Sequence, residues 1–284
     1  MEDINSQIKK IALGTVQFGL DYGISNNSGK TPSHEVGEIL SICKANNIDT
    51  LDTAFGYGDS EKDLGQFDLS AFKIVSKFLD NKSSKGLYLD KQLEQSLEYL
   101  NVPRIYGYLG HRPLLVTNRD WICLQELKKE GVIEKIGFSF NKPEEVDIVL
   151  NNGFIPDLVQ APFNYLDNRF TQKLRFLKEN YKTEIHTRSV FLQGLFFMKT
   201  NELPLFFEPL KNALQEIETI EDKAGALLRY VLMQPFIDKV VIGVNHKQQL
   251  IQNIAQVKEA EVLKKLNSNF FPEVCLMPSN WPKL

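Results

Sequence analysis

The chain has 284 residues, of which 43% are hydrophobic and 24% are charged, a composition typical of a soluble globular protein. Its 33 Lys and Arg residues and 36 Asp and Glu residues leave a net charge of −3, which provides no basic field for nucleic acid. No run of about 18 apolar residues and no apolar N-terminal core is present, so we expect no membrane span, no signal peptide and a cytoplasmic location.

Short runs of β-branched or aromatic residues, each bounded by turn residues, predict eight β-strands. The predicted strands are Ile11–Phe18, Thr50–Ala54, Phe72–Phe78, Arg104–Gly110, Glu134–Phe140, Leu158–Asn164, Thr183–Val190 and Lys239–Val244.

Segments with apolar residues at helical spacing lie between these strands. The predicted helices are Ser33–Asn47, Leu87–Leu100, Arg119–Glu130, Asn141–Asn152, Asn168–Tyr181, Thr219–Gln234 and His246–Leu266. The stretch Thr200–Leu210 interrupts the alternation, and its prolines and phenylalanines predict a long loop packed over one mouth of the fold.

The repeated order of strand and helix is typical of parallel βαβ units. Such units form either an open doubly wound sheet or a closed barrel, and the Gly-rich dinucleotide fingerprint of the open form is absent after the first strand. No break in composition marks a linker. We therefore predict an α/β fold, a single (β/α)8 TIM barrel in which residues 1–284 form one domain.

The cysteines and histidines show no metal-ligand spacing. Cys43, Cys123 and Cys275 are odd in number and far apart in the sequence, which favours reduced thiols over a disulfide framework. The four histidines form no His-x-x-x-His pair, so we predict no metal site.

Neighbouring strand ends of the predicted barrel carry polar side chains. Asp52 and Tyr57 follow the second strand, Lys77 ends the third, and His111 follows the fourth. In TIM barrels, functional residues gather at the C-terminal ends of the strands and in the loops that follow. Taken singly, Tyr57 could close a turn and Lys77 could be a surface lysine with a buried stem. Together they indicate one site.

These residue types fit the reduction of a carbonyl by hydride transfer, because the oxygen that becomes an alcohol needs a proton donor. Tyr57 is the predicted general acid, and the Lys77 ammonium would stabilise its phenolate. Asp52 would hold Lys77 in place, and His111 would orient the carbonyl oxygen by a hydrogen bond.

The segment Asp52–Gly65, with Tyr57-Gly58 and Ser60-Glu61 in its middle, resembles the catalytic signature of the aldo-keto reductase superfamily. Leu13–Gly19 resembles the first strand of that family, and Leu109–Pro113 resembles the end of its fourth strand. Gln160–Arg169 resembles the sixth strand, Arg188–Leu195 the seventh-strand motif, and Ile242–Asn253 the eighth strand. The resemblance implies a barrel that binds NADPH without a Rossmann domain and reduces aldehydes or ketones.

The resemblance also implies which residues bind the cofactor. They are Gly14, Thr15, Gln17, Asp52, Ser139, Gln160, Arg188, Ser189, Gln193, Gly243, Asn245, Gln249 and Asn253. Among them, Ser139 and Gln160 resemble the residues that bind the nicotinamide carboxamide, and Arg188 resembles an arginine that stacks on the ring. The family often has Asn after that Ser, where this chain has Phe140.

One departure from the family pattern concerns the choice of cofactor. Many relatives place a basic residue just after the glycine that corresponds to Gly243, to bind the 2′-phosphate of NADPH, whereas Lys247 is the only permanent cation near it here. NADP(H) is the expected cofactor, with NAD(H) as the alternative.

The predicted substrate pocket contains Phe18, Tyr22, Phe55 and Arg112, with the aromatic loop around Phe206. This mixture suits a small-molecule carbonyl that is polar or sugar-like, although Arg112 fits a surface ion pair equally well. A second function stays open, that of a cofactor-binding barrel with a sensor or regulatory role and little turnover, because fold does not fix function. No feature of the sequence indicates an oligomeric state.

Overall fold

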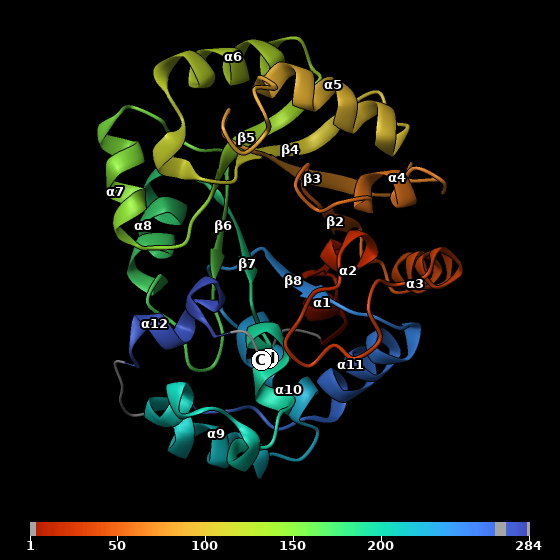
Figure 1. Ribbon diagram of the computed structural model, residues 1–284, viewed down its shortest axis with the longest axis vertical. Coiled ribbons are helices and arrows are strands. Elements are labelled where there is room, and N and C mark those ends of the chain that lie inside the picture. The colour runs from red at the N-terminus through yellow and green to blue at the C-terminus, as the bar shows by residue number, and fades with distance from the viewer. Residues whose placement is uncertain (1–3, 265–270, 283–284) are drawn as a thin grey trace.

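The computed structural model describes residues 4–264 and 271–282, and its parallel strands close into a barrel (Figure 1). The strands follow chain order around the barrel, and β8 pairs back onto β1. They are β1 Ile11–Gly14, β2 Thr50–Asp52, β3 Lys73–Phe78, β4 Ile105–Gly110, β5 Ile133–Ser139, β6 Leu158–Pro162, β7 Glu184–Arg188 and β8 Lys239–Gly243. The predicted (β/α)8 fold is confirmed.

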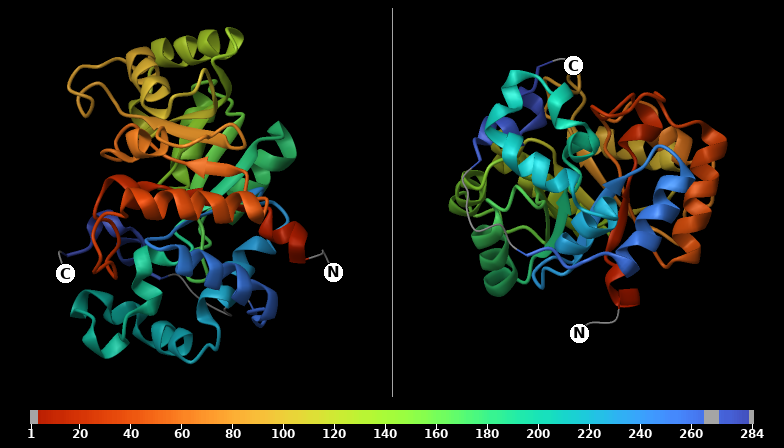
Figure 2. Two further views of the ribbon diagram at one scale, coloured as in Figure 1. Left: turned by 90° about the vertical axis from the view of Figure 1, so that its right-hand side faces the viewer. Right: turned by 90° about the horizontal axis from the view of Figure 1, so that it is seen from below.

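Helices surround the ring of strands on its outside (Figure 1). The α-helices are α1 Ile4–Ile8, α2 Val16–Gly19, α3 Ser33–Ala45, α4 Ser60–Leu64, α5 Leu89–Leu100, α6 Asn118–Lys129, α7 Glu144–Asn151, α8 Thr171–Tyr181, α9 Lys211–Glu218, α10 Lys223–Leu232, α11 Lys247–Glu259 and α12 Glu273–Leu276. Short 3₁₀ turns are η1 Pro113–Leu115, η2 Leu192–Phe197, η3 Thr200–Glu202, η4 Leu205–Leu210 and η5 Pro278–Asn280. Figure 2 shows α1 and α12 on opposite sides of the barrel.

The first strand is shorter than predicted, because the chain turns into helix α2 after Gly14. The amide of Phe18 donates to the carbonyl of Thr15, and the amide of Leu20 donates to that of Val16, so turn bonds replace the ladder bonds of a strand. The apolar residues Val16 and Phe18 fit the period of a strand, but over so few residues this period does not exclude a helical turn.

The segment between β7 and β8 also differs from the prediction. Thr200–Leu210 contains the turns η3 and η4 and leads into α9, a helix that the sequence analysis missed. The predicted helix Thr219–Gln234 begins only at Lys223, because Asp222 has a φ of 47° in the left-handed region. The predicted helix His246–Leu266 ends at Glu259, and its residues 265–266 lie outside the described residues.

Side chains inside the barrel form layers of alternating polarity. Alternation along the strands puts Val75 on the same face as Lys77, and Leu158 on the same face as Gln160. An apolar layer of Val75, Leu109 and Leu158 therefore lies beneath the polar residues at the C-terminal mouth. Below it, Glu184 accepts a hydrogen bond from the Tyr106 hydroxyl at 2.6 Å and forms an ion pair with Lys135. The apolar layer thus separates the mouth from this polar floor.

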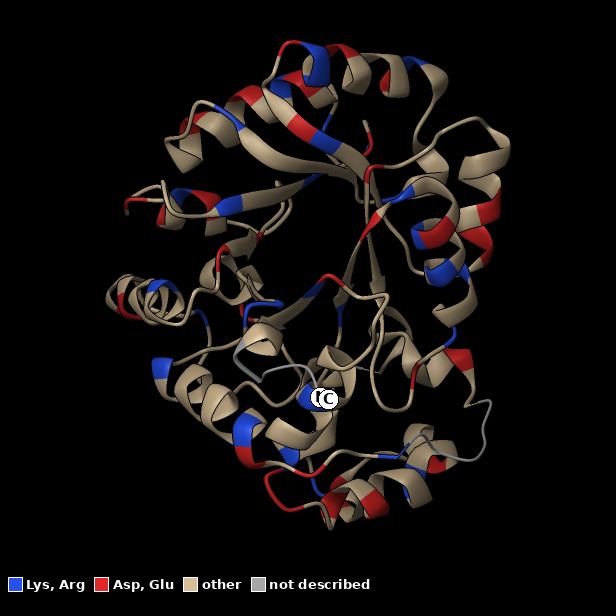
Figure 3. Cartoon of the chain, turned by 180° about the vertical axis from the view of Figure 1, so that it is seen from behind, with Lys and Arg blue, Asp and Glu red and all other residues tan. Residues whose placement is uncertain are grey.

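A second apolar core lies beside the barrel and fixes the segment after β7. Phe207 and Leu210 of η4 pack there with residues of η2, α9, α10 and α12. Acidic and basic residues are interspersed along the outer helices (Figure 3). Within residues 4–264 and 271–282, no helix combines the length and apolarity that crossing a membrane requires.

The apolar layer makes a direct prediction about stability. Leu158 is fully buried, so Leu158→Ala should lower the free energy of unfolding by about 2–5 kcal/mol in a denaturant titration. Leu205→Ala is the matched control, because that leucine is 85% exposed and its loss should change stability by less than about 0.5 kcal/mol. Equal effects of the two substitutions would contradict this view of the interior.

Candidate active site

A buried ion pair occupies the C-terminal mouth of the barrel. The Lys77 ammonium donates to both carboxylate oxygens of Asp52, at 2.9 and 2.8 Å, and to the carbonyl of Thr53 at 2.7 Å. Asp52 ends β2, and the register of β3 pairs it with Val75, so Lys77 stands two residues further toward the mouth. Lys77 has no exposed surface, so its charge is stabilised by protein groups, chiefly these oxygens.

The electrostatics of this pair keep the lysine charged. Burial alone would lower the pKa of Lys77, but the Asp52 carboxylate, with a smaller contribution from Tyr57, raises that pKa above its usual value. Lys77 therefore stays protonated at neutral pH, and the Asp52 carboxylate balances its charge.

Tyr57 lies beside this charge. The Lys77 ammonium is 3.4 Å from the Tyr57 hydroxyl and 4.9 Å from the centre of its ring. The backbone of Tyr57 is held by its own amide, which donates to the carbonyl of Ala54, and by its carbonyl, which accepts from the amide of Ser60. Helix α2 packs against this turn so closely that a Cβ on Gly19 would lie 1.7 Å from the Tyr57 carbonyl oxygen. Glycine at position 19 is what permits this close approach.

His111 completes the group of residues that the sequence singled out. Its ring lies edge-on to that of Tyr57, with 6.1 Å between the ring centres, and its Nδ1 is buried without a hydrogen-bond partner. Burial, followed by the nearby charges of Lys77, Arg188 and Arg112, lowers the pKa of His111 to about 3. The imidazole is therefore neutral at neutral pH, and one of its nitrogens carries a proton that it can donate.

Gln160 connects the ion pair to the other side of the mouth. Its Nε2 donates to Asp52 Oδ1 at 2.6 Å, while its buried Oε1 has no partner. Ser139, at the end of β5, is the register partner of Gln160 and is also buried. An unpaired amide oxygen next to a hydroxyl suits a ligand that has an amide group.

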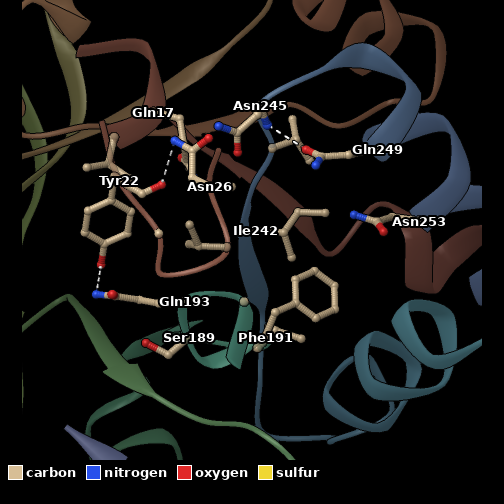
Figure 4. Close-up of a pocket in the computed structure, with 18 of the residues that line it drawn as sticks. Gln17, Tyr22, Asn26, Ser189, Phe191, Gln193, Ile242, Asn245, Gln249 and Asn253 are labelled. Atoms are coloured by element: carbon tan, nitrogen blue, oxygen red, sulfur yellow. Dashed lines mark hydrogen bonds between the residues drawn. The ribbon is translucent and has the colours of Figure 1, made fainter. Parts of the chain in front are cut away.

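A cavity of about 360 Å³ runs from Asp52 and Tyr57 to helix α11. Its wall includes almost all of the predicted cofactor-binding residues: Gly14, Thr15, Gln17, Asp52, Arg188, Ser189, Gln193, Gly243, Asn245, Gln249 and Asn253. Ser139 and Gln160 are the exceptions. Gln160 is buried against Asp52, and Ser139 is buried beside Gln160 on the neighbouring strand. Figure 4 shows Gln249 and Asn253 on the α11 side, and Tyr22 and Gln193 meeting across the cavity. The Gln193 amide donates to the Tyr22 hydroxyl at 2.7 Å.

Comparison with known proteins agrees with this geometry. The model of the Aldo/keto reductase family matches residues 10–268. The chain belongs to the aldo/keto reductase family. This membership supports an oxidoreductase that acts on carbonyl substrates. A search of curated proteins gave no match.

Solved structures of aldo-keto reductases share the fold. AKR11C1 from Bacillus halodurans, solved in a holo form, is 19% identical and superposes with a TM-score of 0.70 over 90% of this chain and 88% of its own. The glycerol dehydrogenase AKR11B4 from Gluconobacter oxydans is 20% identical, with a TM-score of 0.66 over 90% of this chain and 88% of its own. At such identities the likeness establishes the fold alone.

The predicted substrate residues of this aldo/keto reductase are more scattered than its cofactor residues. Tyr22 lines the large cavity, and Arg112 lines a second cavity of about 250 Å³ together with His111. Phe18 was predicted to line the substrate pocket, but α2 turns its side chain into the core, where it is fully buried. Phe55 is half-buried and lines neither cavity, and Phe206 packs against the second core rather than over the mouth.

Several wall residues were missed by the sequence analysis. Gln252 and Gln256 line the cavity from the same face of α11 as Gln249, and this spacing of three and four residues was readable from the sequence. Phe191 and Phe197 reach the wall from the segment after β7, whose backbone includes left-handed residues at Gln193 and Gly194. No local sequence pattern predicts the course of the backbone through this segment.

The buried ion pair predicts a large cost for removing one partner. Lys77→Met should lower the free energy of unfolding by about 3–5 kcal/mol, because it leaves the buried Asp52 carboxyl group without its ammonium partner. Lys91→Met breaks the exposed pair with Glu94 and should cost less than about 1 kcal/mol in the same denaturant titration. Similar losses in the two variants would contradict the role given to burial.

The low pKa of His111 predicts a pH effect on stability. In the unfolded chain this histidine titrates near pH 6.5, so the unfolded state binds more protons than the folded state between about pH 6.5 and pH 3. Its contribution to stability is therefore present above that range and is lost as the pH falls. Between about pH 7.5 and pH 5, the free energy of unfolding should fall less in His111→Gln than in the wild type.

The control for this measurement is His34→Gln, which makes the same change at an exposed position. It should keep the wild-type pH dependence. Parallel curves for wild type and His111→Gln would show that the imidazole is not held neutral.

Proposed function

We propose that this aldo/keto reductase reduces an aldehyde or ketone to an alcohol with NADP(H) or NAD(H), using Asp52, Tyr57, Lys77 and His111. The observation that carries the proposal is the position of one buried ammonium, which contacts the Asp52 carboxylate and the Tyr57 hydroxyl at once. This arrangement gives a tyrosine hydroxyl the positive neighbour that an acid needs when it releases its proton.

Each side chain then has a separate task. Tyr57 donates a proton to the carbonyl oxygen, and Lys77 stabilises the phenolate that remains. Asp52 holds Lys77 in position. His111, neutral at physiological pH, donates a hydrogen bond to the same carbonyl oxygen and so orients the substrate. A bound reduced nicotinamide supplies the hydride.

The residues of the large cavity fit such a cofactor. Ser139 and the unpaired oxygen of Gln160 would hold the carboxamide. Arg188 would face the ring, and its guanidinium is fixed by hydrogen bonds to the carbonyl of Phe140 at 3.0 Å and to Asn141 at 2.7 Å. Gly243 leaves room beside Gln17, because a Cβ there would lie 2.4 Å from the Gln17 amide nitrogen. The amides of α11 would receive the adenosine.

The second cavity supports a polar substrate, which includes sugar-like carbonyls. His111 forms part of its wall, so a carbonyl held by His111 would have its remaining atoms directed toward this space. Arg112 and Asp80 are 3.5 Å apart on the same wall, and Arg119 and Asp120 lie nearby. Paired charges of both signs offer donors and acceptors to hydroxyl groups.

Further predictions complete the proposal. Residues 1–284 act as one domain in the cytoplasm, on a small molecule, with no nucleic-acid or membrane partner and no metal. Within the described residues, no group of three or more His, Cys, Asp or Glu side chains is arranged to hold a metal ion.

The decisive variant is Tyr57→Phe, which removes the proton donor and keeps the ring. With NADPH or NADH and a panel of aldehydes and ketosugars, wild type should consume the reduced nicotinamide. Tyr57→Phe should slow this by about 10²–10⁴-fold. Quenching of nicotinamide fluorescence should persist in the variant, because Tyr57 is only one residue of a long cavity wall.

The control is Tyr99→Phe, which removes a hydroxyl from α5, outside both cavities. It should keep wild-type turnover. Binding of a nucleotide without turnover of any panel member by wild type would favour the sensor function instead, and absence of nucleotide binding would overturn both.

A further inference from the structure

The end of the large cavity on α11 is lined by neutral amides. Asn245, Gln249, Gln252, Asn253 and Gln256 form this end. Among the described residues that line the cavity, Arg188 supplies the one Lys or Arg side chain. It stands at the end of β7, where it is bound to the β5 loop. The α11 end of the wall therefore contributes no positive charge of its own.

Lys247 is the cation near Gly243 that the sequence analysis identified, and it forms an ion pair with an acidic residue. Its ammonium donates to Glu38 of α3 at 2.7 Å, and this contact raises the pKa of Lys247 above its usual value. A second carboxylate from α3, that of Glu35, accepts a hydrogen bond from the backbone amide of Lys247 at 3.2 Å. Glu35 is buried, so its charge acts through protein rather than through water.

Two backbone amides at the start of α11 are also engaged. The N-terminus of a helix attracts anions through such amides. Here the backbone amide of Lys247 donates to the Glu35 carboxylate. The backbone amide of Asn245 donates to the side-chain oxygen of Gln249 at 2.7 Å (Figure 4). A protein carboxylate has thus already taken the role that a ligand phosphate would play at this turn.

We infer that Glu35 and Glu38 make this site select NAD(H) over NADP(H), an inference that rests on the proposed function. A 2′-phosphate carries a charge of about −1.5 to −2 at neutral pH. Next to Asn245 and Gln249 of the cavity wall it would meet two backbone amides that are already bonded. The Glu35 and Glu38 carboxylates, which contact Lys247 behind that wall, would repel it, and the Lys247 ammonium is already paired. A ribose with free hydroxyls brings no charge, and the amides of Gln249 and Asn253 can bond to it without cost to either carboxylate. This reverses the order of preference that the family resemblance implied.

The first test is calorimetric titration of the intact protein with NAD⁺ and, separately, NADP⁺, without any substrate. We expect NAD⁺ to bind at least about tenfold more tightly than NADP⁺. Equal binding, or tighter binding of NADP⁺, would overturn the inference and leave the proposed reductase function standing. Failure of both nucleotides to bind would overturn the function itself.

The second test assigns the selectivity to the α3 carboxylates. In Glu35→Gln/Glu38→Gln, position 35 keeps an acceptor for the Lys247 amide, while two negative charges are removed and the Lys247 ammonium loses its carboxylate partner. The affinity for NADP⁺ should rise by about tenfold, and that for NAD⁺ should stay within about twofold. Glu38→Gln alone changes only a partly exposed side chain and should give part of the same gain.

Glu208→Gln provides the control, since it neutralises an exposed glutamate of η4 that pairs with Lys211 and not with a residue of α11. It should alter neither affinity. Gains of equal size for both nucleotides in the double variant, or no gain for NADP⁺, would overturn the role of Glu35 and Glu38.

Discussion

The site depends on one buried ion pair, in which the ammonium of Lys77 and the carboxylate of Asp52 lie at the mouth of the barrel, above an apolar layer. Taking both charges out of water is expensive, and it is tolerable only when every remaining donor and acceptor is satisfied. The carbonyl of Thr53, the amide of Gln160 and the hydroxyl of Tyr57 meet that demand. The pair therefore fixes side chains from β2, β3 and β6 relative to one another.

The same charge sets the state of its neighbours. Lys77 acts together with burial and with Arg188 and Arg112 to keep His111 neutral. It also leaves a positive charge beside the hydroxyl of Tyr57, while α2 holds the Tyr57 backbone at a distance that only glycine at position 19 allows. One ion pair thus connects Tyr57 on one side of the mouth to Gln160 on the other. At the α11 end of the long cavity, Glu35 and Glu38 of α3 both contact Lys247.

Much of this arrangement was predictable because a parallel barrel brings consecutive strand ends to one mouth. Asp52, Tyr57, Lys77 and His111 each follow or end a strand, and closure of the barrel places them together. The fate of Phe18 was not predictable, since turn hydrogen bonds decide between strand and helix over so few residues. The contacts of Lys247 were not predictable either, because its acidic partners on α3 are 212 and 209 residues away in the sequence. Ion pairing over such separations leaves no local pattern.

The central claim is that this mouth transfers hydride to a carbonyl carbon. It is tested most directly with reduced nicotinamide cofactors deuterated at the transferable position of C4, in both the NADH and the NADPH form, and glyceraldehyde as a probe aldehyde. Mass spectrometry of the product should find one deuterium on the carbinol carbon of the alcohol in every turnover. Alcohol formed without deuterium, or bound nucleotide that yields no alcohol from this or any other carbonyl offered, would contradict the claim.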